Sequence, residues 1–141
     1  MKKIVPLLLL IVLLVISCDS EEEDNGRSAW FTLTYRNIGA SCNSTNLNFT
    51  FLVTRSSDGL QATQTVAKGV TVSGNNLGFT EGTTLNVQVF AASSEEPLHE
   101  ANIPFIYTNY TDEQLNSNDN ELQISYCHQE DTGNITWVFD I

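Results

Sequence analysis

The stretch AWFTLTYR, residues 29–36, decides the fold class because its apolar and polar side chains alternate. Successive residues of an extended strand point to opposite faces, so a two-residue period gathers one set of side chains on a single face. The set expected to face a core consists of Ala29, Phe31, Leu33 and Tyr35. The residues between them are mostly polar, so the stretch predicts a half-buried β-strand.

The same two-residue period recurs along the chain. It predicts further strands within residues 47–55, 84–91, 101–107, 121–127 and 134–141. Residues 61–73 form a weaker candidate, which Gly69 is expected to break or bulge. Turn-forming residues separate these segments, at 57–59, 74–76, 81–82 and 131–133.

About seven strands without a long helical period predict an all-β fold, an antiparallel β-sandwich of immunoglobulin-like or transthyretin-like type. The one helix signal is a single turn over residues 111–115, where Thr111 and Gln114 are placed to form a capping box. The length of the chain after its leader suits a single domain with its own core.

The first residues have the composition of a signal peptide. Lys2 and Lys3 precede an apolar run over residues 4–16, and Ser17 is small, as a cleavage site requires. The run is too short to cross a bilayer comfortably. We therefore divide the chain into a signal peptide (1–17), an acidic tether (18–27) and a β-sandwich domain (28–141).

The residues Val15-Ile16-Ser17-Cys18 resemble the lipobox of bacterial lipoproteins. The resemblance implies that the Cys18 thiol carries a diacylglyceryl group and that cleavage occurs in front of it. Two or three acyl chains would then hold the protein stably on a membrane. The residues themselves leave a second interpretation open, an ordinary secretory signal followed by a solvated acidic segment.

The acidic run after Cys18 resembles the export signal of surface lipoproteins in Bacteroidetes-type bacteria. The residues that carry this resemblance are Ser20, Glu21, Glu22, Glu23 and Asp24. It implies an outer-membrane protein that is lipid-anchored and displayed at the cell surface.

The net charge of −11 excludes some classes of partner. An acidic surface repels phosphate backbones, so we expect no nucleic-acid ligand. The chain also offers no polybasic patch for anionic lipid, so attachment to a membrane would depend on the acyl anchor.

Three cysteines leave an even pair, Cys42 and Cys127, if Cys18 carries lipid. An exported protein folds where disulfides persist, so a Cys42–Cys127 disulfide is predicted. Two separate buried thiols are the alternative, because sequence alone does not place the two sulfurs within bonding distance.

No catalytic or cofactor motif is present, so we expect a protein that is not an enzyme and binds no cofactor. Cys127 and His128 are adjacent, and adjacent residues on a strand point to opposite faces rather than forming a nucleophile–base pair. Residues 116–121 carry alternate oxygen ligands, but they lack the glycine and distal glutamate of a calcium loop, so no metal is expected.

Some apolar residues fall at positions expected to face solvent, and a cluster of them would mark a binding surface. They are Trp30, Leu52, Phe90, Ile106 and Val138. Trp30 and Phe90 are the strongest candidates, and they favour a protein- or glycan-binding module. A structural or accessory lipoprotein of an envelope complex is the alternative function. Singly exposed apolar residues are also common without any function.

Overall fold

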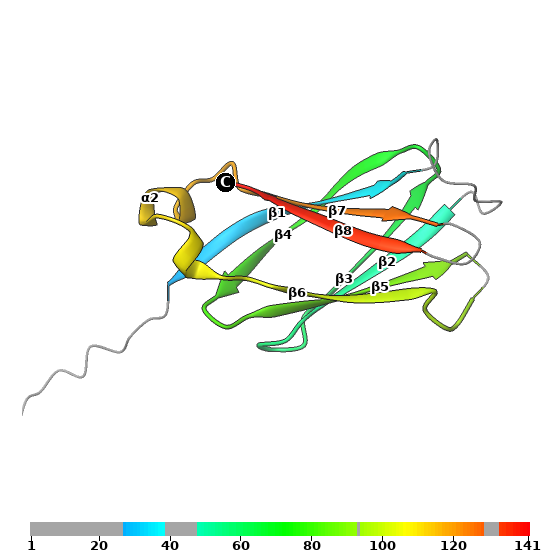
Figure 1. Cartoon of the computed structure of the whole chain (residues 1–141), viewed down its shortest axis with the longest axis horizontal. Coiled ribbons are helices and arrows are strands. Elements are labelled where there is room, and N and C mark those ends of the chain that lie inside the picture. The colour runs from blue at the N-terminus through cyan, green and yellow to red at the C-terminus, as the bar shows by residue number, and fades with distance from the viewer. Residues whose placement is uncertain (1–26, 39–47, 93, 129–132) are drawn as a thin grey trace, which may run out of the picture.

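The structure, a computed structural model, describes residues 27–38, 48–92, 94–128 and 133–141. These residues form eight strands and two short helices (Figure 1). The strands are β1 (Ser28–Asn37), β2 (Asn48–Arg55), β3 (Gln61–Ala67), β4 (Thr71–Thr80), β5 (Thr84–Ala91), β6 (His99–Pro104), β7 (Glu121–Cys127) and β8 (Asn134–Asp140). The helices are η1 (Tyr107–Asn109) and α2 (Asp112–Leu115).

The strands form two four-stranded sheets that pack face to face, which confirms the predicted all-β sandwich (Figure 1). Their orders are β4-β1-β7-β8 and β3-β2-β5-β6. Neighbouring strands are antiparallel except β1 and β7, which are parallel. Because β1 and β2 lie in different sheets, the order departs from the immunoglobulin arrangement, in which the first two strands share a sheet. The transthyretin-like type stays a prediction.

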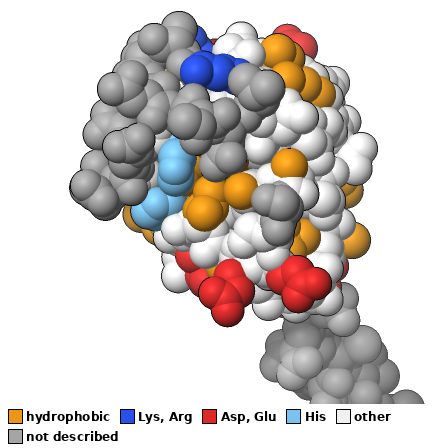
Figure 2. Space-filling model, turned by 90° about the vertical axis from the view of Figure 1, so that its right-hand side faces the viewer, with side chains coloured by type: hydrophobic (Ala, Val, Ile, Leu, Met, Phe, Trp, Pro, Cys, Tyr) orange, Lys and Arg blue, Asp and Glu red, His pale blue; other side chains and the backbone are white. Residues whose placement is uncertain are grey.

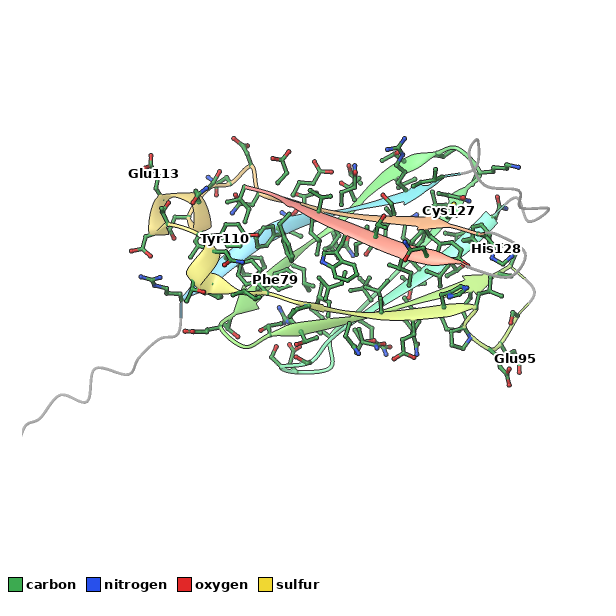
Figure 3. All side chains as sticks on the ribbon, viewed as in Figure 1. Phe79, Glu95, Tyr110, Glu113, Cys127 and His128 are labelled. Atoms are coloured by element: carbon green, nitrogen blue, oxygen red, sulfur yellow. The ribbon has the colours of Figure 1, made fainter. Side chains whose placement is uncertain are left out.

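Side chains of the predicted inward set fill the space between the sheets (Figure 3). Phe31 is fully buried, and its ring centroid lies 5.2 Å from Phe79, 5.2 Å from Phe105 and 5.3 Å from Phe139. Edge-to-face contacts of this kind stabilise a core beyond the area they bury. Trp137 has inward parity but is 39% exposed, because β8 is an edge strand.

The predicted weak strand over residues 61–73 is two strands, so the sandwich has eight strands rather than about seven. Gly69 has a φ of 74° and turns the chain between β3 and β4. A left-handed backbone of this kind favours glycine. The two strands do not pair with each other, because the turn carries the chain from one sheet to the other.

The predicted turn over residues 74–76 lies inside β4 instead. Thr32 pairs with Asn76 and Thr34 with Ser73, so two residues of β4 oppose the single residue Leu33. This is a β-bulge. Glycine and asparagine suit a bulge as well as the predicted turn. A Cβ on Gly74 would lie 2.7 Å from the Tyr35 ring, so the glycine makes room for that side chain.

The predicted capping box is confirmed at α2. Thr111 Oγ1 accepts a hydrogen bond from the Gln114 amide at 3.3 Å, and Gln114 Oε1 accepts one from the Thr111 amide at 2.9 Å. The strand predicted over 101–107 ends earlier, at Pro104, and the chain continues into η1. No helix within the described residues is long and apolar enough to cross a membrane.

Replacing Phe31 with alanine should reduce the free energy of unfolding by about 3–5 kcal/mol, since it removes the shared partner of three aromatic contacts. Urea denaturation followed by fluorescence measures the change. Val138→Ala is the matched control, because Val138 is 61% exposed and its loss should change stability by no more than about 0.5 kcal/mol. Equal effects of the two substitutions would contradict this assignment of the core.

Candidate functional site

Trp30 projects from the outer face of β1 and is 62% exposed, so most of its indole is available for contact. Its cross-strand partner on the edge strand β4 is Gly78. A Cβ at Gly78 would lie 3.2 Å from two atoms of the six-membered indole ring and 3.3 Å from a third. Nearly equal distances of this kind describe a ring laid across the glycine. One face of the indole is therefore supported by β4, and the other faces solvent.

Two hollows flank the indole, and together with Trp30 we call them the Trp30 platform. The first has a volume of about 340 Å³ and is lined by Ser28, Trp30, Arg55, Ser57, Gly78, Phe79 and Thr80. The second has a volume of about 380 Å³ and is lined by Trp30, Phe31, Thr32, Asn76 and Asn118. Both fall at the lower end of the range of small-ligand sites, roughly 300–1,000 Å³. Phe79, which lines the first hollow, is at the end of the sandwich where β1 begins (Figure 3).

The first hollow is formed where the β2–β3 turn meets the edge strand of the other sheet. Arg55 ends β2, and its guanidinium donates to the Gly78 carbonyl across this gap. The same guanidinium donates to both oxygens of Asp58, at 2.9 and 2.6 Å. The charge of Arg55 is thus matched by a bidentate carboxylate within the site.

The hydrogen bonds from Arg55 lower the pKa of the Asp58 carboxyl to about 2, with a further contribution from the Leu60 amide. The same pairing raises the pKa of Arg55, so both groups are charged at neutral pH. Their mutual pairing leaves the first hollow without a net charge.

The second hollow exists because pairing between β1 and β7 begins only at Thr32, so Trp30 has no strand neighbour on that side. The loop between α2 and β7 occupies the adjacent space, and the Thr32 amide donates to the Asn120 carbonyl at 2.9 Å. The Asn120 side chain is buried and donates to the Gln114 carbonyl of α2 at 3.0 Å, which fixes the loop. Its Oδ1 has no hydrogen-bond partner within the described residues.

The polar lining of the second hollow has unused hydrogen-bonding capacity. Thr32 Oγ1 donates to Asn76 Oδ1 at 2.9 Å, which leaves the Asn76 amide nitrogen available as a donor. The Asn118 side chain makes no hydrogen bond to another described residue, and it is exposed. Both amides can therefore bind polar groups of a ligand.

The structure does not bring the two predicted binding residues together. Phe90 lies on β5, opposite Thr50 of β2, with the parity of the outer face of the second sheet. Trp30 lies on the outer face of the first sheet. Phe90 and Leu52 are also only partly exposed, whereas Trp30 is 62% exposed. The two candidates therefore do not form one surface, and the rest of the site is described around Trp30.

The two histidines lie at the end of the sandwich away from residue 27 (Figure 2). Both are close to Tyr126. Tyr126 is buried, and its hydroxyl lies 2.9 Å from His128 Nδ1. The Gly133 amide donates to His99 Nε2 at 3.1 Å, so that nitrogen is an acceptor. Within the described residues, no three or more His, Cys, Asp or Glu side chains form a group that could hold a metal ion.

Of the remaining predicted site residues, the structure places Cys127 alone. Cys18, the acidic run from Ser20 to Asp24, and Cys42 all lie outside the described residues. Cys127 is the last residue of β7 and is partly buried (Figure 3). Lipidation, surface export and the Cys42–Cys127 disulfide therefore stay predictions.

Sequence analysis missed the polar residues of the platform. The spacing of Arg55 and Asp58 across a turn was a usable signal for their ion pair. Other parts of the platform depend on contacts between residues distant in sequence, so no local pattern indicates them. These are the cross-strand pair of Trp30 and Gly78 and the position of Asn118.

The Asp58 carboxyl should titrate with a pKa of about 2 in the folded protein, as followed by NMR of the side-chain carboxyl. Its usual value is about 3.9, so the pairing adds stability above that pH, and this contribution is lost as pH falls through about 2. Arg55→Met should raise the pKa of Asp58 toward the usual value. Arg36→Met is the control and should leave it unchanged. A wild-type pKa near 4 would contradict the assigned pair.

No protein-family model matches this chain, and the searches of curated proteins and of solved structures also found no match.

Proposed function

We propose that this chain is a non-enzymatic binding protein, lipid-anchored to the outer membrane and displayed at the cell surface, whose protein or glycan ligand binds the Trp30 platform. One observation carries the proposal: the indole is 62% exposed, laid across Gly78 and flanked by two hollows. A large aromatic surface held in one orientation loses little conformational entropy when a ligand binds.

The anchor is supported by the lipobox-like residues ending at Cys18 and by the acidic run that follows. Ser28, the first residue of β1, is ten positions after Cys18 in the sequence. A chain of that length spans at most about 35 Å when fully extended. The domain would therefore stand close to the membrane, with the end that carries Trp30 nearest the tether.

The Cys42–Cys127 disulfide is part of the same proposal. Cys127 is not a free thiol. The chain on both sides of Cys42 is anchored beside the end of β7: the Ile38 amide donates to the Tyr126 carbonyl at 3.0 Å, and the Phe49 ring lies 4.9 Å from the Tyr126 ring. Cys42 is four residues after Ile38 and seven before Phe49, so it is within reach of Cys127.

Intact-mass spectrometry of the purified protein tests both covalent proposals. We expect a chain that begins at Cys18 with the mass of added acyl groups, and Cys18→Ala should carry none. Without reductant, a thiol reagent should add no mass to Cys42 or Cys127, and after reduction it should modify both. A full-length unacylated chain would overturn the anchor, and modification of either cysteine without reductant would overturn the disulfide.

Cells displaying the protein test the binding role. Wild-type cells should adhere to at least one coating in a panel of immobilised glycans and extracellular proteins, and Trp30→Ala should abolish that adhesion. Phe90→Ala is the matched control, since Phe90 is an aromatic residue on the other sheet and its loss should leave adhesion intact. Antibody labelling of intact cells verifies that the wild type and both variants are displayed equally. Adhesion that is absent from wild-type cells, or that persists in Trp30→Ala, would overturn the proposal.

A further inference from the structure

We propose that the Trp30 platform binds a neutral, extended glycan chain that passes over Trp30 from one hollow to the other, with one sugar ring stacked on the indole. The proposal rests on the proposed function, because it names the ligand class of the same platform.

The shape of the aromatic surface favours a sugar ring. The supported face of the indole is closed by Gly78, so a ligand meets one flat, open face at the level of the sheet surface. A pyranose ring presents C–H groups on its flat faces and hydroxyl groups around its rim. Stacking on Trp30 would bury the C–H groups and direct the hydroxyl groups toward the hollows on either side.

The lining of the hollows provides neutral hydrogen-bonding groups for those hydroxyls. On one side these are the side-chain amides of Asn76 and Asn118, and on the other the hydroxyls of Ser28 and Ser57. The Ser28 and Ser57 hydroxyls make no hydrogen bond to other described residues. A ligand rich in hydroxyl groups satisfies such a surface, whereas an apolar peptide side chain would leave it unpaired.

The charges at the platform further restrict the class of ligand. Among the described residues that line the two hollows, Arg55 alone carries a formal charge, and Asp58 matches it at 2.9 and 2.6 Å. A carboxylated or sulfated chain would find no unmatched cation there, and it would approach a protein of net charge −11. Neutral sugars need no matching cation and are not repelled by the negative charge of the protein.

The two hollows imply a chain rather than a single sugar. The first hollow, of about 340 Å³, is lined on the Ser28 side of Trp30, and the second, of about 380 Å³, on the Thr32 side. One ring stacked on the indole would therefore not fill both. A ligand that uses the stacking surface and both hollows needs about three linked units, one on the indole and one in each hollow, since binding pockets bury most of the surface of their ligand.

Isothermal titration of the full acylated chain in detergent tests the proposal. The probes are gluco-, manno- and xylo-oligosaccharides of one to six units, with oligogalacturonides of the same lengths as charged counterparts. At least one neutral series should bind, with Kd falling at least tenfold between one and three or four units and little beyond. The oligogalacturonides should bind at least tenfold more weakly.

Variants connect that binding to the platform. Trp30→Ala should weaken it at least tenfold, and Phe90→Ala should not change it. Gly78→Val keeps the tryptophan but places side-chain atoms against its ring, so it should also weaken binding severalfold. Asn118→Ala should weaken the longer chains more than the single sugar. Thermal unfolding of each variant verifies that the fold is intact.

Several results would overturn this inference: no binding of any neutral series, tighter binding of the charged chains, or binding unchanged in Trp30→Ala. Cell adhesion to protein coatings that depends on Trp30, without oligosaccharide binding, would overturn the glycan assignment and leave the proposed function standing. If no coating shows adhesion that depends on Trp30, both the glycan assignment and the proposed function are overturned.

Discussion

The packing of Phe31 against Phe79, Phe105 and Phe139 sets the register of the first strand, and the position of the Trp30 platform depends on it. Side chains of a strand alternate between two faces, so a ring fixed in the core at position 31 directs its two neighbours outward. Trp30 and Thr32 are those neighbours. Phe79 does the same for β4, where it places Gly78 on the outer face beside the indole.

Much of the fold could be predicted from the sequence because a half-buried sheet leaves a local signal. Alternation in residues 29–36 predicts which side chains of β1 are buried, and the capping box at Thr111 predicts α2. Gly69 shows where a local signal is incomplete. A break in a strand was visible, but whether the chain bulges or crosses to the other sheet depends on packing between the sheets. The parallel pairing of β1 and β7 has no local signature for the same reason.

The candidate site was predicted only in part. The outward position of Trp30 follows from its parity, and so does that of Phe90. Their separation follows from the assignment of β1 and β5 to different sheets, which strand parity does not encode. The polar half of the platform comes from four separate parts of the chain: β1, the end of β2 with the turn after it, the edge strand β4 and the loop after α2. The alternation of side chains within one strand does not indicate which other parts of the chain lie beside it in the fold.

The short stretch of chain between Arg27 and Trp30 has a mechanical consequence. Ser28, Ala29 and Trp30 pair with β4 alone, since β7 joins β1 only from Thr32 onward. A pull on a ligand stacked on the indole would reach the preceding segment after three residues. Most of the sandwich, including its farther end, would lie outside that line of force.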